Sequence, residues 1–490
     1  FGTTTVDGTD ADDDGSDPLL RTAVFPAAIA GAILFGVLGD LYGRRIVLVV
    51  TSVIVAVFGI VTSFVDTFQM LVLTRCAVSF GIGGMTVGFD LCAELLPPNK
   101  RGRYLAMIQI FWTIGALIAH LTLKFHQHKD DNPGYDDDSN NSEFDDGDNN
   151  DGVDNGWRWI AGMFAIPGVL SFLVTVFLVP DSPRWYLAQG RHDDALSILR
   201  TAAKVNNKDP SIVFPDGVML FSHEYSSQQH HYRHDDHDED NNNNNNTNDR
   251  SVVWSSSFST YLSSSCWSSL KSSSLSQIFN LCSVGWMSIT AVLWTTYFGK
   301  AFLEHGSVSM AVDVFSYDGR QQEYQAVFTA ASELVGLCFV ICLVDRWGRS
   351  MTQMICYASS GIFCLSLALL EDFDRPSVNP NLLLGLVFFS HLFVHGGTVT
   401  TWIATTEVLT TTIRTTGHGT AHAFSRVGGG LSTFILSRIY SIPTVGLILF
   451  VTALWTASSA SKLPETKVKD MGTVHYPADP RRSSRSRRRR

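Results

Sequence analysis

The chain has 490 residues and a formal net charge of −10, with 45% hydrophobic and only 17% charged residues. Soluble domains carry about 25% charged residues and disordered chains carry few apolar ones, so this composition excludes both classes. The charges cluster in a few loops and in an Arg-rich end. The composition predicts a polytopic membrane protein, whose eight cysteines are small core residues rather than a disulfide framework.

A helix that crosses the bilayer core needs about 20 mostly apolar residues. Eleven stretches of the chain meet this requirement, so we predict an all-α fold with eleven membrane spans. They lie near residues 22–40, 46–65, 68–92, 104–123, 157–179, 278–302, 325–344, 351–370, 381–404, 416–437 and 443–461.

Every second short loop between these spans is basic, at residues 44–45, 100–103, 346–349 and 414. Because Lys and Arg accumulate in cytoplasmic loops, we expect these loops to face the cytosol and the acidic insert 126–155 to lie outside. An odd number of spans, an initial Phe and the absence of a signal peptide lead us to expect one more span before residue 1.

Three patterns occur twice in the same order, which predicts an internal duplication. The pairs are Asp40-Leu41-Tyr42-Gly43-Arg44 with Asp345-Arg346-Trp347-Gly348-Arg349, Glu94 and Arg101 with Glu407 and Arg414, and Pro180-Asp181-Ser182 with Pro464-Glu465-Thr466. Two related bundles joined by a long loop describe a transporter architecture whose substrate site lies between the halves, near the midplane.

The duplication and the charge pattern together define five segments. They are an acidic external segment (1–18), a first bundle of five spans (19–180), a cytoplasmic loop (181–275), a second bundle of six spans (276–465) and a cytoplasmic Arg-rich tail (466–490). In the loop, Ser182 as N-cap and Pro183 as first helical residue predict a helix that ends near Asn206. The His-, Asn- and Ser-rich remainder predicts disorder.

At these motifs the sequence resembles the major facilitator superfamily, and in particular the branch of synaptic-vesicle-2-related proteins and their organic-ion and nicotinate transporter relatives. The motifs are Gly36 to Arg45, Phe80-Gly81-Ile82-Gly83-Gly84, Ala93-Glu94-Leu95-Leu96-Pro97, Phe111-Trp112-Thr113-Ile114-Gly115, Gly156-Trp157-Arg158-Trp159, Pro180-Asp181-Ser182-Pro183-Arg184-Trp185, Ser332-Glu333-Leu334-Val335-Gly336 and Thr406-Glu407-Val408-Leu409.

The resemblance implies two bundles of six helices and alternating access. The sequence departs from the family at Gln109, where relatives often carry an acid, in the absence of the family's first helix, and in the insertions 126–155 and 207–275.

The repeated charges predict a cytoplasmic gate that closes when a transporter faces outward. Each loop can latch its neighbours, because a carboxylate favours a helix N-terminus and arginine pairs with carboxylates in two-pronged fashion. Static anchoring by basic loops is the alternative. The predicted gate residues are Asp40, Arg44, Arg45, Glu94 and Arg101 in the first half, and Asp345, Arg349, Glu407 and Arg414 in the second.

Ionisable residues inside spans are costly and usually mark function, although a structural ion pair is the alternative. His391 with His395, and His418 with His422, are each spaced to share one helix face, where packing, proton relay and metal binding all remain open. The candidate substrate or proton residues are Arg75, Asp90, Trp112, Tyr297, Glu333, His391, His395 and Arg426.

We therefore expect a secondary transporter of a small organic solute, such as an organic ion, a nicotinate-like acid or a sugar, with protons as a second candidate ligand. The alternative is a transport-inactive membrane receptor or scaffold. Because no phosphate loop or nucleophile constellation is present, we expect no enzyme activity, cofactor, metal or nucleic-acid partner. We expect a monomer in the plasma membrane or an endomembrane vesicle, with Arg481–Arg490 attracting anionic lipid.

Overall fold

The structure is a computed structural model. It describes residues 16–130, 156–215, 218, 220, 276–283, 285–317, 323–373, 380–436, 438–439 and 441–467. The sequence predictions for the acidic insert, the low-complexity part of the central loop and the Arg-rich tail lie largely outside these residues.

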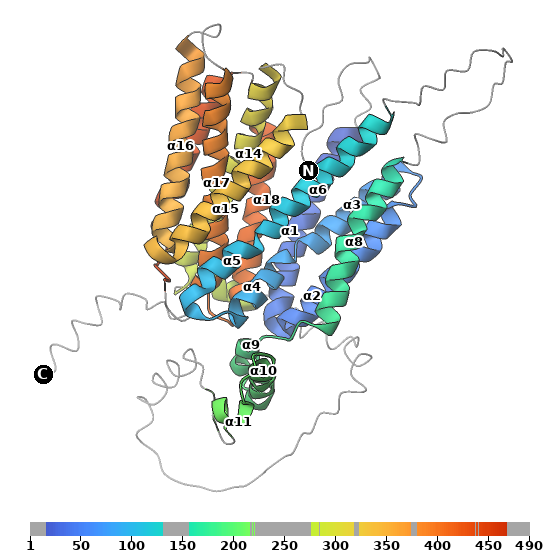
Figure 1. Ribbon diagram of the computed structural model, residues 1–490, viewed down its shortest axis with the longest axis vertical. Helices are drawn as coiled ribbons and strands as arrows, with labels where there is room; N and C mark the ends of the chain where they lie inside the picture. Colours follow the sequence, from blue (N-terminus) through green and yellow to red (C-terminus); the bar gives the residue numbers. More distant parts are fainter. Residues whose placement is uncertain are drawn as a thin grey trace, which may run out of the picture.

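The described residues form helices and connecting turns (Figure 1). The first half contains α1 (Ser16–Tyr42), α2 (Arg44–Thr62), α3 (Phe68–Ile82), α4 (Met85–Leu95), α5 (Arg101–Ile108), α6 (Ile110–Asp130) and α8 (Gly156–Phe177). The second half contains α14 (Met287–Tyr317), α15 (Glu323–Trp347), α16 (Arg349–Phe373), α17 (Pro380–Val408), α18 (Arg414–Leu436) and α19 (Ile442–Ala460). Between them come α9 (Pro183–Ala188), α10 (His192–Val205) and α11 (Pro210–Val213).

The two halves meet along an interface, called the seam below, that consists of two equivalent contacts. In one contact α1 packs against α18, and in the other α15 packs against α5 and α6. Figure 1 shows the halves converging at the end of the bundle nearest α9 and α10, and separating toward the opposite end. We call the convergent end the gate end. It is where α1, α4, α15 and α17 stop and where α2, α5, α16 and α18 begin.

Nine helices in the described part are long and apolar enough to cross a membrane. They correspond to nine of the eleven predicted spans. The other two predicted spans correspond to the helices α14 and α18, in which polar residues lie between the apolar ones. Most of α18 is buried by protein, including Arg414, His418 and His422. Surrounding helices therefore shelter its polar side chains, which explains how a helix of low hydropathy lies within this bundle.

Several predicted boundaries are wrong. The stretch predicted at 278–302 is two segments, because the chain turns near Gly285 and the long helix α14 runs from Met287 to Tyr317. The single helix predicted after Ser182 is also two helices, since Gly190 takes a φ of +73° and ends the first. The predicted cap is confirmed: Ser182 Oγ accepts a hydrogen bond from the Trp185 N–H at 3.2 Å, and Asn206 caps the end of α10.

Candidate functional site

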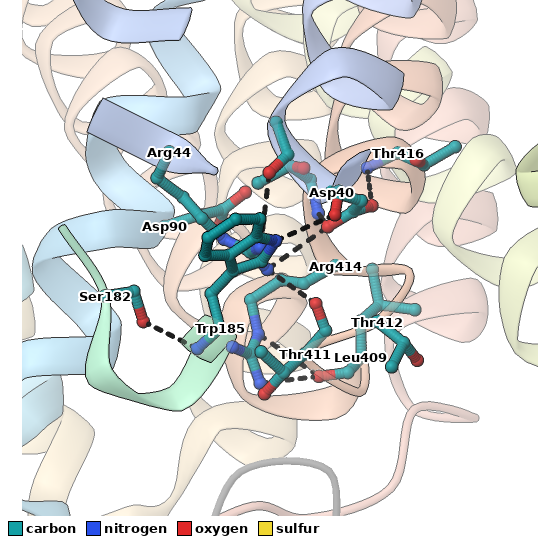
Figure 2. A network of polar contacts seen from close by, with 12 residues as sticks. Asp40, Arg44, Asp90, Ser182, Trp185, Leu409, Thr411, Thr412, Arg414 and Thr416 are labelled. Atoms are coloured by element: carbon teal, nitrogen blue, oxygen red, sulfur yellow. Dashed lines mark hydrogen bonds and ion pairs between the residues drawn. The ribbon is translucent and has the colours of Figure 1, made fainter. Parts of the chain in front are cut away.

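A buried charge cluster joins the two halves at the gate end (Figure 2). Arg44 Nη2 donates to Asp40 Oδ1 at 3.1 Å and lies 3.2 Å from Glu94 Oε1. Arg414, from the other half, donates to the same Glu94 oxygen. All four side chains are almost fully buried. One carboxylate therefore binds a guanidinium group from each half.

Asp40 also caps a helix of the opposite half. The backbone N–H groups of Thr415 and Thr416 donate to its two carboxylate oxygens at 3.2 and 2.8 Å. These amides belong to the first turn of α18, where the helix leaves its N–H groups unpaired and its dipole favours a negative charge. Thr415 Oγ1 donates in turn to the Gly36 carbonyl at 2.7 Å.

A second cluster repeats this arrangement with the halves exchanged. Arg349 donates two hydrogen bonds to Glu407, at 2.8 and 2.9 Å, and lies 3.2 Å from Asp345 Oδ1. Asp345 accepts from the backbone N–H of Arg103 in the first turn of α5 at 3.3 Å. Arg101 lies 3.8 Å from Glu407. The two clusters thus use equivalent residues of the duplicated motifs.

The sequence pattern predicted one charge network within each half, and for Arg101 and Arg414 this prediction is wrong. In the structure each arginine reaches the glutamate of the other half. The reason is that α5 and α18, which these arginines begin, pack against the opposite half. The interaction is therefore between the halves rather than within each one.

The third repeated pattern holds the loop of each cluster. Asp181 Oδ1 accepts from the Arg45 N–H at 3.3 Å, and Glu465 accepts from the Arg349 and Ser350 N–H groups at 3.0 and 3.2 Å. Burial raises the pKa of the Asp181 carboxyl. Of the predicted gate residues, Arg45 alone turns aside, because its guanidinium group donates to the Val176 carbonyl at 2.7 Å.

A second polar region lies near the middle of the helices. Glu333 on α15 accepts from Thr113 Oγ1 on α6 at 2.9 Å, which is another contact between the halves. His391 Nε2 lies 3.6 Å from the other oxygen of Glu333, and His391 Nδ1 lies 2.9 Å from Ser307 Oγ. One turn further along α17, His395 is buried, and neither of its ring nitrogens has a hydrogen-bond partner among the described residues.

Lys300 and Glu304 are the residues of this region that sequence reasoning missed. Lys300 is 3% exposed, and its ammonium group lies 4.7 Å from the Tyr297 ring centroid and 5.6 Å from that of Trp402. Electrostatic interactions couple it to Glu304, one turn along α14, and to Arg426 on α18. A lysine at the end of an apolar run, followed by a glutamate four residues later, was the available signal.

The remaining candidates are distributed unevenly. Tyr297 is fully buried beside His418, and Arg426 Nε has no hydrogen-bond partner in the described part of the chain. Trp112 is 51% exposed on α6. Arg75 lies on α3, which packs mainly against α1 and α2, so the structure places it apart from the polar region of the second half.

The fold and these paired clusters define a polytopic helical membrane protein built from two related halves. The model of the Major Facilitator Superfamily matches residues 152–437, and that of the "Sugar (and other) transporter" family matches residues 18–234. The first match covers more than half of the chain. The chain belongs to the Major Facilitator Superfamily.

Similar proteins include a synaptic vesicle 2-related protein of Xenopus laevis, 25% identical over 440 residues, which are 85% of this chain and 65% of that protein. This chain thus spans slightly less than two thirds of that relative's length. The organic cation/carnitine transporter 7 of Arabidopsis thaliana is 25% identical over 438 residues, or 86% of this chain and 77% of the relative.

Among solved structures, the proton:xylose symporter XylE bound to 6-bromo-6-deoxy-D-glucose has a TM-score of 0.66 at 18% identity, covering 94% of this chain and 90% of XylE. The human organic anion transporter MFSD10 has a TM-score of 0.54 at 16% identity, covering 90% of this chain and 83% of that one. At these identities the likeness concerns the fold.

Proposed function

We propose that this protein is a secondary transporter that moves a small organic solute across a membrane by alternating access. The observation that carries the proposal is the exchange of charges between the halves: Glu94 with Arg414 and Asp40 with the start of α18, mirrored by Glu407 with Arg101 and Asp345 with the start of α5. A contact made of reciprocal, directional interactions can open and re-form as one unit.

The physical argument for a gate is that burying these charges costs free energy and that both charge clusters lie at the gate end. Charged pairs removed from water are often no more stabilising than apolar packing of the same volume. A static joint between two bundles would therefore need only the apolar contacts that this seam also has, such as Leu105 and Ile403. When the halves separate, water can replace each partner, so the clusters favour two hydration states: fully paired or fully solvated.

The solute site in this proposal is the polar region near mid-helix. His395 and Arg426 carry nitrogens without a hydrogen-bond partner in the described part of the chain. Glu304 and Glu333 lie in the same region, where Lys300 sits beside the aromatic rings of Tyr297 and Trp402. Such groups suit a solute that carries a charge or several polar groups together with an apolar body. The organic-ion and sugar transporters among the similar proteins support this solute class.

The test is uptake into proteoliposomes of the full chain, with a panel of nicotinate, organic cations, sugars and phosphate. We expect saturable uptake of at least one compound. Asp40→Ala should abolish it while insertion and folding persist, because the start of α18 loses its cap. Asp66→Asn, which changes an exposed pair with Arg158 elsewhere, is the control and should transport normally. A folded protein that binds and moves none of the panel would favour the receptor or scaffold alternative.

A further inference from the structure

A further pair of ionisable residues connects the halves beside the first charge cluster. That cluster, formed by Asp40, Arg44, Glu94 and Arg414, is called the gate cluster below. Asp90 on α4 and His418 on α18 are both fully buried, and Asp90 Oδ1 lies 2.8 Å from His418 Nδ1. Their other polar atoms, Asp90 Oδ2 and His418 Nε2, have no hydrogen-bond partner among the described residues. Rings of Phe89, Tyr297 and Trp402 surround the imidazole at 5.0 to 6.2 Å between centroids.

The internal duplication supplies a comparison within the same molecule. Asp90 precedes Glu94 by four residues, as Ile403 precedes Glu407, and His418 follows Arg414 by four, as Leu105 follows Arg101. Leu105 and Ile403 are fully buried members of one apolar cluster. The equivalent place in the second contact is thus filled by two apolar side chains. Joining the halves does not in itself require an ionisable pair here.

The charge balance of the gate cluster indicates what the pair does. The carboxylates of Asp40 and Glu94 balance the guanidinium groups of Arg44 and Arg414, so an ionised Asp90 beside a neutral His418 leaves one negative charge unpaired. One further proton on the pair removes that charge. Because an unpaired buried charge is strongly destabilising, the closed gate end favours the protonated pair.

We propose that Asp90 and His418 form a proton-binding site shared by the two halves, occupied when the gate end is closed and emptied when the halves separate. Separation breaks the hydrogen bond and lets water hydrate both side chains, which removes the reason to hold the proton. His422 lies one turn away on α18 against Trp402, with both ring nitrogens unpartnered in the described residues. It offers a relay toward mid-membrane.

Charged and titratable side chains surround Asp90 and His418 on the elements that pack against them. They are Glu94 and Cys92 on α4, Arg414 and His422 on α18, Arg44 on α2 and Tyr297 on α14. Asp40 on α1 and Asp181, from the connection before α9, act on Arg44. The gate-cluster charges are satisfied by partners of opposite sign. Asp90 is therefore the carboxylate of this contact that is paired with a histidine rather than with an arginine.

The inference deepens the proposed transport function, but its test needs no solute. Spin labels are placed at positions 104 and 351, which are exposed on α5 and α16 near the gate end, in a full chain whose native cysteines are replaced. Double electron–electron resonance then measures the distance between the two labels and gives the ratio of short to long distances from pH 5 to pH 8.5. We expect the closed-to-open ratio to fall as pH rises, by up to about tenfold per pH unit, since one proton is linked to closure.

The double substitution Asp90→Ile with His418→Leu copies the pair of the other contact. It should close normally and lose the pH dependence. Asp90→Asn keeps the shape and hydrogen bonding of the site and should behave in the same way, which covers the case in which the double variant fails to fold. Asp66→Asn should keep the wild-type slope. A wild-type ratio that does not change with pH, or an Asp90 variant that keeps the slope, would overturn the proposal. A persisting slope without uptake would instead reject transport alone.

Discussion

Glu94 and Glu407 occupy equivalent positions but carry unequal shares of the contact between the halves. Glu94 binds Arg414 directly across the seam, whereas Glu407 makes its two short bonds to Arg349 of its own half and lies 3.8 Å from Arg101. Glu94 therefore makes close contacts with arginines of both halves, whereas Glu407 makes close contacts mainly within its own half.

We predict that Glu94→Gln opens the gate end more than Glu407→Gln does. Removing one partner of a buried ion pair typically costs about 3–5 kcal/mol, and for Glu94 much of this cost falls on the closed arrangement alone. Glu407→Gln should instead lower the melting temperature of the protein with less opening. Label distances at the gate end and thermal unfolding in detergent measure the two effects, and equal opening by both variants would contradict this assignment.

At the scale of the element, the two motif loops show how a short local pattern fixes a backbone shape. Gly43 and Gly348 have φ values of +99° and +95°, which side chains with a Cβ rarely adopt. A Cβ at Gly43 would also lie 2.7 Å from Asp181 Oδ2, and one at Gly348 would meet the Glu465 carboxylate. Each carboxylate can reach the first N–H groups of the next helix only because glycine leaves this space.

We predict that Gly43→Ala and Gly348→Ala each destabilise the protein by more than Gly190→Ala. All three glycines have positive φ, so each substitution carries a backbone cost. For Gly43, whose ψ is +154°, this cost is about 1–3 kcal/mol, because that region is essentially restricted to glycine. Around Gly190 no atom lies within 4 Å of an added Cβ, so this variant lacks the carboxylate contact. Thermal unfolding of the three variants tests this, and equal losses would show that the carboxylate contacts contribute little.

At the scale of the whole molecule, α1 and α18 come into direct backbone contact across the seam. A Cβ at Gly36 would lie 2.5 Å from the Thr415 carbonyl oxygen, and one at Gly39 would lie 3.2 Å from Thr415 Cβ. Such close approach belongs to the closed gate end and must be lost if the halves rock apart.

We predict that a disulfide between Gly39→Cys and Thr415→Cys stops uptake and that a reductant restores it. The Cβ separation is just below the usual 3.5–4.5 Å of a disulfide, so a small adjustment allows the bond. The control pair is Gly59→Cys with Ala165→Cys, which lies within the first half at 3.0 Å between Cβ positions. This internal cross-link should leave uptake intact. Transport that continues with the first pair fully oxidised would exclude rocking at this seam.

The sequence alone determined the fold class, the repeated motifs and most residues of the two charge clusters. Span length, loop charge and the spacing of Glu94 and Arg101 are properties of neighbouring residues, and local patterns record them directly. The polar helices α14 and α18 were also predicted from sequence, although their composition hides them from a hydropathy criterion.

Only the tertiary structure decided which charges meet. The sequence pattern grouped Arg414 with Glu407 in the second half. The packing of α18 on α1 instead turns Arg414 toward Glu94 of the first half. The same packing brings Asp90 to His418, 328 positions apart in the chain. Contacts of this kind depend on how two separately encoded bundles face each other, and no local pattern contains that information.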